Sequence, residues 1–295
     1  MEIALVSNPT AGKGTARAAT AVAVDRLRSH GVGVRELVGR DGDEALDLCR
    51  RAVEDGVDAL VALGGDGMAH LALQAVADTP TRLGVIAAGT GNDLATHLRL
   101  PIRSPAAAAD VIARGVVRAI DAVRVTPGSA WFGCVLGAGF DSIVNERANL
   151  LRWPKGPQRY NLAIAVELPR FRAIPFRLVL DGDVWETRAM LVAVGNASSY
   201  GAGMKVTPDA RIDDGLLDVF VLGPVSKPEF LRTFPKVFKG THVSHPAVTI
   251  RRARTVTLEA ANVVAYADGE RLAALPVTCE CVPGAVQMLV RAPDA

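Results

Sequence analysis

Three glycine-rich turns, each placed directly after a short apolar run, constrain the fold of this chain more than any other feature. The apolar runs cover residues 2–7, 58–63 and 83–87. Apolar residues at helical spacing follow the turns, so the order strand, turn, helix recurs through the first third of the sequence. This order predicts a parallel sheet with crossover helices, in which ligands bind where the strands end. We therefore expect an α/β unit whose chemistry lies at these turns.

The remainder of the chain has a different pattern. After about residue 122, runs rich in β-branched residues alternate with Gly, Pro and Asp-Gly turns, which is typical of antiparallel strands. Asp181-Gly182 and Asp268-Gly269 are hairpin signals. Expected strands are 177–180, 184–195, 217–222, 247–251, 255–260, 263–266 and 287–290, and expected helices are 144–150, 160–168 and 228–234.

Length and composition agree with two globular domains. The chain has 295 residues, 49% apolar and 22% charged, whereas an ordinary domain has roughly 100–200 residues. We expect an α/β domain over 1–122 and a mainly antiparallel, β-rich domain over 123–283. The tail, 284–295, is expected to return to the first domain.

Charge and cysteine usage exclude several classes of protein. A net charge of +2 is too small for a protein that binds nucleic acid electrostatically, so we expect no nucleic-acid partner. The start has no signal-peptide pattern and no apolar run reaches about 18 residues, so we expect a cytoplasmic protein without a transmembrane segment. The four cysteines fit neither a disulfide framework nor a common zinc spacing.

The first two turns suit an anionic ligand. The first runs from Ser7 to Gly14, where glycines let the backbone approach a ligand and helix-start amides favour an anion. A plain strand–helix connection explains it equally well. The second, Gly64-Gly65-Asp66-Gly67, is more specific, because glycine weakens both the strand and the helix that it joins. We interpret it as a phosphate cradle with Asp66 acting on Mg²⁺; the alternative is a tight turn in which Asp66 caps the next helix.

The third turn runs from Gly89 to Asp93. Thr90 and Asn92 offer hydrogen bonds, and Asp93 offers charge at a helix start, where it is equally consistent with a cap. No single turn is decisive. Their combination at one edge of a parallel sheet indicates a phosphate-bearing ligand.

Together with two later motifs, these turns resemble one known family. SNPTAGKG, GGDG and GTGNDLA, in this order and spacing, are similar to the diacylglycerol kinase catalytic domain family, which includes sphingosine, ceramide and bacterial lipid kinases; the NAD kinases share GGDG more distantly. Residues 208–218, PDARIDDGLLD, match the family element P-x-A-x-x-D-D-G-x-L-D, and 268–270 match its D-G-E element. The motifs cover nearly the whole chain.

The resemblance implies a nucleotide-binding domain over 1–122, a lipid-substrate domain over 123–283, and ATP and Mg²⁺ as cofactors. Asp66, Asp93 and Asp121 would surround the Mg²⁺ of Mg-ATP through water. Residues that would hold the phosphates and ribose, in a cleft between the domains, are Asn8, Pro9, Thr10, Ala11, Gly12, Lys13, Gly64, Gly65, Asp66, Gly67, Thr90, Asn92 and Asp93.

A second Mg²⁺, with a structural role, is implied for the acidic loop. Asp214 and the main-chain carbonyls of Arg211 and Leu216 would bind it, since hard cations prefer oxygen ligands. The alternative for this loop is a plain β-turn.

Asp268 and Glu270 are the implied acid/base pair. A lipid hydroxyl is a poor nucleophile at neutral pH, so a carboxylate accepts its proton as the bond to the γ-phosphorus forms. Positioning and charge neutralisation supply most of the remaining catalysis. Which of the two carboxylates accepts the proton is left open. Without the resemblance, this segment would be interpreted as a hairpin turn.

Three positions depart from the family pattern. Met68 stands where a Thr usually follows GGDG, and His70 and Leu71 replace an Asn-Glu pair that is common in bacterial members. Met68 lacks the hydroxyl that would contact phosphate, and Leu71 removes a carboxylate. We interpret His70 as a surface or packing residue of its helix.

The expected function is an ATP-dependent lipid kinase acting on diacylglycerol to give phosphatidic acid. The alternatives are a phosphotransferase similar to NAD kinase, with a water-soluble acceptor, and a non-catalytic nucleotide- or lipid-binding protein. Residues 147–177 and 227–254 each carry seven cations and one acid among aromatic residues. These stretches suit peripheral contact with the inner face of the cell membrane, or equally a solvated face over core aromatics. A homodimer is left open.

Overall fold

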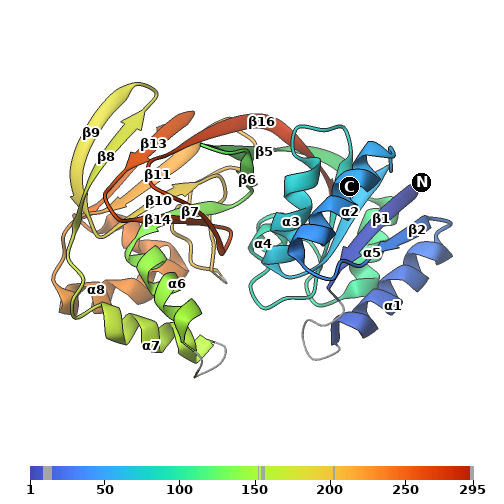
Figure 1. Cartoon of the computed structure of the whole chain (residues 1–295), viewed down its shortest axis with the longest axis horizontal. Coiled ribbons are helices and arrows are strands. Elements are labelled where there is room, and N and C mark those ends of the chain that lie inside the picture. Colours follow the sequence, from blue (N-terminus) through green and yellow to red (C-terminus); the bar gives the residue numbers. More distant parts are fainter. Residues whose placement is uncertain (9–14, 152, 154–156, 202, 293–295) are drawn as a thin grey trace.

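Two long strands join the two halves of the molecule (Figure 1). The computed structural model describes residues 1–8, 15–151, 153, 157–201 and 203–292. Strand β16 (Val277–Val290) runs from one half into the other, and β5 (Val116–Thr126) pairs antiparallel along its length. A single sheet of ten strands therefore passes through both halves.

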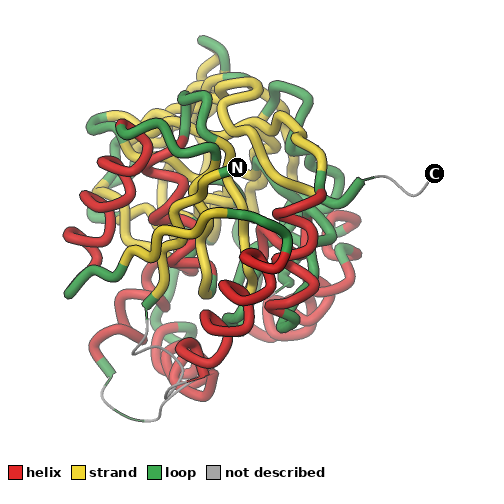
Figure 2. The backbone as a smooth tube through the Cα atoms, turned by 90° about the vertical axis from the view of Figure 1, so that its right-hand side faces the viewer, coloured by secondary structure: helices red, strands yellow, loops and turns green. Residues whose placement is uncertain are grey.

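The amino-terminal half has the parallel sheet that the turns predict. Its strand order is β2-β1-β3-β4-β16, and β16 pairs in parallel with β4 at Gln287 and Met288. Helices α1 and α5 pack on one face, and α2 and α3 on the other. Figure 2 shows the helices beside the strands, seen from the end of the molecule where this half lies. The bounds are β1 (Glu2–Ser7), α1 (Thr15–Ser29), β2 (Gly33–Leu37), α2 (Gly42–Glu54), β3 (Ala59–Gly64), α3 (Asp66–Val76), β4 (Arg82–Ala87), α4 (Asp93–His97) and α5 (Pro105–Arg114).

Local chemistry explains why these elements form. Strands β1 and β3 are almost continuously apolar and buried, as expected for a parallel sheet covered on both faces. Helix α2 begins at a cap in which the Asp41 carboxylate accepts the Glu44 amide at 2.9 Å. Its Ala45, Cys49 and Ala52 recur at helical spacing and are buried against the sheet.

The carboxyl-terminal half is a sandwich of antiparallel strands. One layer is the continuation of the large sheet through β16, β13, β8 and β9, with β6 beside β5; the other is a sheet of order β12-β11-β10-β7-β14-β15. Phe132, Leu136, Val192 and Leu258 are among the buried residues between the layers. The bounds are β6 (Ala130–Phe132), β7 (Val135–Gly139), β8 (Ile174–Leu180), β9 (Asp183–Ala189), β10 (Leu191–Gly195), β11 (Leu217–Leu222), β12 (Val248–Ala253), β13 (Thr255–Glu259), β14 (Val264–Ala267) and β15 (Glu270–Ala274).

A layer of helices covers the other face of the second sheet (Figure 1). Phe140 and Phe230 join this layer, with ring centroids 5.2 Å apart. Within the described ranges, no helix combines the length and the hydropathy needed to cross a membrane. The bounds are α6 (Phe140–Leu150), α7 (Pro157–Glu167), α8 (Lys227–Thr233) and the 3₁₀ helices η2 (Phe234–Lys239) and η3 (Thr241–Ser244).

The expected fold class, α/β followed by antiparallel β, is confirmed, but two strand predictions are wrong. Residues 184–195 form two strands in different sheets, because Ala189 and Met190 are both buried, in different cores, and this breaks the alternation of a single strand. Residues 287–290 are the end of β16 rather than a separate strand. The Pro283-Gly284 step, which suggests a break in the sequence, is accommodated by a register shift between Val282 and Val286.

Candidate active site

The second and third glycine turns contact each other backbone to backbone. Strands β3 and β4 are neighbours, and beyond their ends the Ala88 amide donates to the Gly64 carbonyl at 2.8 Å. A Cβ on Gly89 would lie 2.4 Å from the Gly65 Cα, so the two turns have no room for side chains here. Of the first turn, Asn8 is described and exposed; Pro9, Thr10, Ala11, Gly12 and Lys13 lie outside the described residues.

This close approach predicts a large penalty for Gly89→Ala. The new methyl group collides with backbone that cannot rotate away, so the turns must separate, and we expect ATP affinity to fall together with roughly 1–3 kcal/mol of stability. Calorimetric ATP titration and urea unfolding measure the two effects. Gly42→Ala is the matched control, because a Cβ there meets nothing within 4 Å. Unchanged ATP affinity in Gly89→Ala would contradict the prediction.

Asp66 clamps the third turn. One carboxylate oxygen accepts the Asp93 amide at 2.7 Å and the other accepts the Asn92 amide at 2.8 Å. Asp66 therefore caps α4, whereas the alternative interpretation had it capping α3, whose cap is Gly65. Asn92 has a positive φ of 60° and closes the turn with two side-chain hydrogen bonds to the Gly89 backbone. Thr90 is exposed between them.

The start of α3 offers free amides to the cleft. In the described part of the chain, the amides of Asp66 and Gly67 have no hydrogen-bond acceptor, as is usual for the first turn of a helix. They favour an anion, helped by the helix dipole. The departure at Met68 leaves these amides clear, because its side chain folds back over Gly64, where a Cβ would lie 2.5 Å from Met68 Cγ.

The D-G-E segment lies directly against this helix start. Glu270 is exposed, and its Oε1 would lie 2.9 Å from a Cβ on Gly67. The β14–β15 hairpin thus carries Glu270 from the β half to the GGDG turn of the α/β half. Among the described residues, no side-chain hydrogen bond or ion pair engages the Glu270 carboxylate, so it can contact a ligand.

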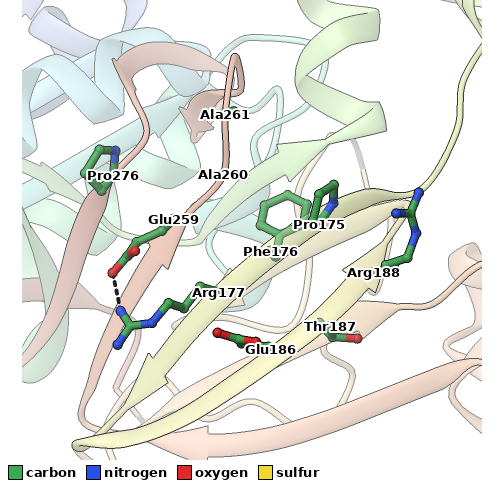
Figure 3. Close-up of a pocket in the computed structure, with 10 residues that line it drawn as sticks. All are labelled: Pro175, Phe176, Arg177, Glu186, Thr187, Arg188, Glu259, Ala260, Ala261 and Pro276. Carbon is green, nitrogen blue, oxygen red and sulfur yellow. Dashed lines mark hydrogen bonds and ion pairs between the residues drawn. The ribbon is translucent and has the colours of Figure 1, made fainter.

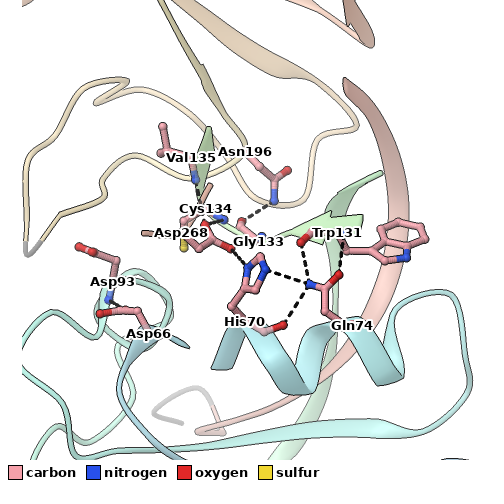
Figure 4. Close-up of polar contacts among 10 residues, drawn as sticks. All are labelled: Asp66, His70, Gln74, Asp93, Trp131, Gly133, Cys134, Val135, Asn196 and Asp268. Atoms are coloured by element: carbon pink, nitrogen blue, oxygen red, sulfur yellow. Dashed lines mark hydrogen bonds and ion pairs between the residues drawn. The ribbon is translucent and has the colours of Figure 1, made fainter. Parts of the chain in front are cut away.

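Asp268 is held much more firmly. With Gly269 it forms the two-residue turn between β14 and β15, so the hairpin interpretation and the family match both describe this segment. Its carboxylate accepts the amides of Gly133 at 2.8 Å, Cys134 at 2.9 Å and Val135 at 3.2 Å (Figure 4). It also lies 3.4 Å from His70 Nδ1. Of the two interpretations of His70, surface or packing residue, the first is wrong: its side chain is 11% exposed and its ring packs against the site.

Three carboxylates meet around one small cavity between the halves. Asp66, Asp93 and Asp268 line a space of about 20 Å³. Asp93 also accepts the Gly203 amide of the β half at 3.0 Å. Burial, followed by the charges of these three residues, raises the pKa of the Cys134 thiol well above its ordinary value, so this thiol stays protonated at neutral pH.

Asp121 does not lie in this group. Its carboxylate accepts the Gly215 amide at 2.7 Å and the Gly284 amide at 2.9 Å, which ties the acidic loop to the bulge of β16. Burial, then Asp121 and Asp214, raises the pKa of Cys281 to about 12. The structure thus divides the predicted acidic residues into two places, Asp66 with Asp93 and Asp121 with Asp214.

In the acidic loop, protein groups engage the Asp214 carboxylate that would bind the implied structural Mg²⁺. One oxygen of Asp214 accepts the Leu216 amide at 3.2 Å and the other pairs with the Arg252 guanidinium. The Arg211 side chain lies 3.9 Å from Asp213. A guanidinium therefore stands where the carboxylate would meet the cation, and the metal site at this loop stays a prediction.

Asn196 connects the segment that holds Asp268 with the strand that carries Asp121. The sequence analysis did not identify it as a site residue. It is fully buried, and its side-chain amide donates to the Gly133 carbonyl at 2.8 Å and to the Asp121 carbonyl at 3.0 Å. The sequence does contain a signal, because the buried strand ending at Gly195 runs into Asn-Ala-Ser-Ser-Tyr-Gly, the same change from apolar to small and polar residues that marks the GGDG turn.

Asp141 is a second residue that the sequence analysis missed. It lies in the first turn of α6, close to the Tyr200 hydroxyl, and its Oδ2 is buried without a hydrogen-bond partner. Burial raises its pKa from 3.8 to about 6. The unfolded chain loses this proton near pH 4 and the folded chain only near pH 6, so folded protein binds more protons in between and stability falls as pH rises.

We therefore expect Asp141→Asn to remove part of the pH dependence of stability. Between pH 4 and pH 7, wild type should lose about 2 kcal/mol through this group, and the variant should not. Urea unfolding of both proteins at both pH values gives the difference. The exposed Asp183→Asn is the matched control and should keep the wild-type dependence. An identical pH dependence in Asp141→Asn would contradict the assignment.

A hollow larger than the small cavity between the halves lies on the β8–β9 hairpin (Figure 3). It has a volume of about 740 Å³ and is crossed by an ion pair between Arg177 and Glu259, 2.5 Å apart. In Figure 1 this hairpin lies at the end of the molecule away from the parallel sheet. None of the predicted site residues lines it.

Comparisons with known proteins agree with this division of the chain. The model of the diacylglycerol kinase catalytic domain matches residues 2–125, and that of the YegS C-terminal NAD kinase beta sandwich-like domain matches 134–290. A diacylglycerol kinase of Mycobacterium tuberculosis (strain ATCC 25618 / H37Rv) is 43% identical over 292 residues, covering 98% of this chain and 94% of that protein. A probable lipid kinase YegS-like of Stenotrophomonas maltophilia (strain K279a) is 32% identical over 280 residues, covering 90% and 89%.

Solved structures share the fold. A putative diacylglycerol kinase from Bacillus anthracis str. Sterne superposes with a TM-score of 0.80 at 24% identity, over 98% of this chain and 97% of that one. An NAD kinase from Archaeoglobus fulgidus, in complex with ATP, gives 0.56 at 14% identity, over 98% and 93%. At these identities the likeness concerns the fold alone.

Proposed function

The chain belongs to the diacylglycerol kinase catalytic domain family and is a lipid kinase, and from this premise we propose that it transfers the γ-phosphoryl group of ATP to the hydroxyl of diacylglycerol, forming phosphatidic acid. One observation carries the proposal: the free carboxylate of Glu270, from the β half, lies against the amide-rich start of α3 in the α/β half. This arrangement brings a proton acceptor to an anion site, as transfer to an alcohol requires.

The two carboxylates of the D-G-E segment take different roles in this proposal. Glu270 accepts the proton of the lipid hydroxyl, because its carboxylate is exposed and has no partner in the described residues. Asp268 holds the hairpin in place, because its oxygens already accept three backbone amides. With His70 beside them, these amides occupy the acceptor positions of the Asp268 carboxylate, whereas those of Glu270 are open to a ligand.

The amides of Asp66 and Gly67, with the close turn at Gly89, would hold the phosphates. Asp66 and Asp93 fit a magnesium ion bound with ATP, since both line the small cavity and their carboxylates supply the hard oxygens that this ion prefers. When bound, the ion would neutralise phosphate charge. The predicted contribution of Asp121 would have to act from β5, where its carboxylate accepts the Gly215 and Gly284 amides.

An acceptor panel tests the proposed reaction. The purified chain is incubated with ATP and Mg²⁺ and, separately, with diacylglycerol, a sphingoid base, ceramide or NAD, and phosphorylated products are measured by mass spectrometry. Phosphatidic acid as the main product is expected. Phosphorylation of NAD alone would support the alternative related to NAD kinase, and ATP binding without any product would support a non-catalytic protein.

The same proposal places the lipid-binding side of the molecule on an anionic membrane. Helices α6, α7, α8 and η2 form one layer, here called the helical face, in which Lys227 Nζ of α8 donates to the Pro169 carbonyl after α7. Leu150 is 76% exposed and Trp153 77% exposed at its edge. The acids Glu146, Glu167 and Glu229 are all paired.

Cations of the helical face and its margins, in contrast, remain available to contact anionic lipid headgroups. In the part of the chain that the structure describes, no ion pair engages Arg170, Arg172, Arg232, Lys236 or Lys239. Exposed large apolar side chains beside unpaired cations suit the interface of an anionic bilayer.

We expect the chain to co-sediment with vesicles containing phosphatidylglycerol and to release them as salt is raised. Replacing Leu150 and Trp153 with Glu should weaken this binding roughly tenfold, because it adds charge where apolar side chains enter the bilayer. Val184→Glu is the matched control, since Val184 is similarly exposed but lies on the β8–β9 hairpin. Equal binding to neutral phosphatidylcholine vesicles would contradict the charge argument.

A further inference from the structure

His70 lies on the face of α3 that the β14–β15 hairpin covers. It is three residues after Gly67, so the two positions share one side of the helix. Gly67 meets Glu270, and His70 Nδ1 lies 3.4 Å from Asp268 Oδ2. The hairpin therefore contacts the helix at two successive points. Both His70 and Asp268 side chains are only 11% exposed, so little water competes for their contact.

Gln74, one turn further along α3, contacts the other ring nitrogen of His70. The Trp131 amide donates to Gln74 Oε1 at 2.8 Å, and Gln74 Nε2 donates to the Trp131 carbonyl at 2.8 Å, so the orientation of this side-chain amide is fixed (Figure 4). Gln74 Nε2 also donates to the His70 carbonyl at 3.0 Å, which uses both of its protons, and it lies 3.4 Å from His70 Nε2. On the other side of the ring the Asp268 carboxylate can only accept, so Nδ1 donates to it and carries the ring proton.

Asp268 thus contacts both halves of the molecule. The three amides of residues 133–135 hold it within the β half. His70 is its contact with the α/β half, where the phosphate-binding turns lie. Removing the His70 contact leaves the hairpin folded but free to move relative to α3.

We propose that His70 is a positioning residue which, by donating from Nδ1 to Asp268, sets the place of Glu270 relative to the start of α3. This inference rests on the proposed role of Glu270 as proton acceptor. His70 itself touches no reacting atom. Its effect on the reaction passes through the hairpin, so it should matter for the rate of transfer and little for the binding of ATP.

His70→Phe keeps the ring and removes the donor. We expect kcat for lipid phosphorylation to fall roughly ten- to a hundredfold, with KM for ATP and the unfolding temperature near those of wild type. His70→Asn, which keeps a donor nitrogen, should recover part of the rate. The control is His30→Phe, which removes the 2.6 Å contact with Asp110 of α5, away from the site and from the helical face, and should leave kcat unchanged.

A second variant separates positioning from a general loss of structure. In the Glu270→Gln background there is no carboxylate left to position, so His70→Phe should cause no further loss of kcat. A full additional loss there, or wild-type kcat in His70→Phe alone, would overturn the proposal.

The protonation of the ring supplies a test that does not depend on kinase activity. Nitrogen-15 spectra of the histidine rings at pH 8, assigned with His70→Phe, should show His70 protonated on Nδ1 and not on Nε2. A ring protonated on Nε2 would overturn the proposal even in an active enzyme. A wild-type chain that phosphorylates no acceptor would instead remove the proposed function, leaving the Nδ1 donation to be judged by these spectra.

Discussion

Glu270→Gln is expected to lower kcat about 10²–10⁴-fold while leaving ATP affinity and stability close to wild type, because proton transfer by a positioned side chain contributes about that factor. The substitution preserves the shape of the side chain and removes only its capacity to accept a proton. Glu270 is exposed, and its carboxylate has no hydrogen-bond or ion-pair partner in the described residues, so no structural contact is lost with it. Steady-state kinetics with diacylglycerol, ATP calorimetry and thermal unfolding measure the three quantities.

Glu186→Gln is the matched control for this experiment. Glu186 is also an exposed glutamate of an edge strand, but it lies on β9, in the hairpin away from the parallel sheet, and it should retain full activity. Undiminished kcat in Glu270→Gln would assign the proton acceptor elsewhere and leave Asp268 as the remaining candidate of the pair.

Asp268→Ala is expected to have the opposite signature, with a loss of roughly 3–5 kcal/mol of stability in addition to the loss of activity. Its carboxylate accepts three backbone amides in a half-buried place, and each amide is left without an acceptor when the carboxylate is removed. Urea unfolding monitored by circular dichroism measures the stability. The loss of activity should follow, because Glu270 is carried on the same hairpin.

The chain contains its own control for this prediction. Asp181 begins the other Asp-Gly hairpin turn, between β8 and β9, and its carboxylate accepts the amides of Arg254 and Thr255. It is exposed, so Asp181→Ala should cost only about 1 kcal/mol and leave kcat unchanged. If Asp268→Ala is no less stable than Asp181→Ala, the amide contacts of Asp268 do not contribute the roughly 3–5 kcal/mol of stability expected of them.

The two carboxylates show how much of the site could be predicted from the sequence. The D-G-E motif could be located from the sequence, and so could its two competing interpretations. The choice between the carboxylates could not, because the amides that hold Asp268 come from residues 133–135, more than 130 positions away. No short-range sequence pattern indicates that contact.

The other acidic residues and His70 lead to the same conclusion: local patterns were predictable, and long-range contacts were not. Asp66 and Asp93 follow neighbouring parallel strands, so their proximity could be predicted from the strand order. Asp121 lies in the middle of β5, and only the pairing of β5 with β16 decides that it faces the acidic loop. His70 has the spacing of an ordinary helix residue, and only the docking of the β14–β15 hairpin gives it a partner.

The amino-acid sequence by itself determined the order of strands and turns in the α/β half, the antiparallel character of the remainder, the family, and the segments that carry chemistry. These properties follow from periodicity, glycine content and motif spacing, which act over a few residues. Tertiary structure alone decided which carboxylate is free, which are clamped, and how the halves meet. Those outcomes depend on hydrogen bonds between residues far apart in the chain, formed only when β5 and β16 bring the two halves together.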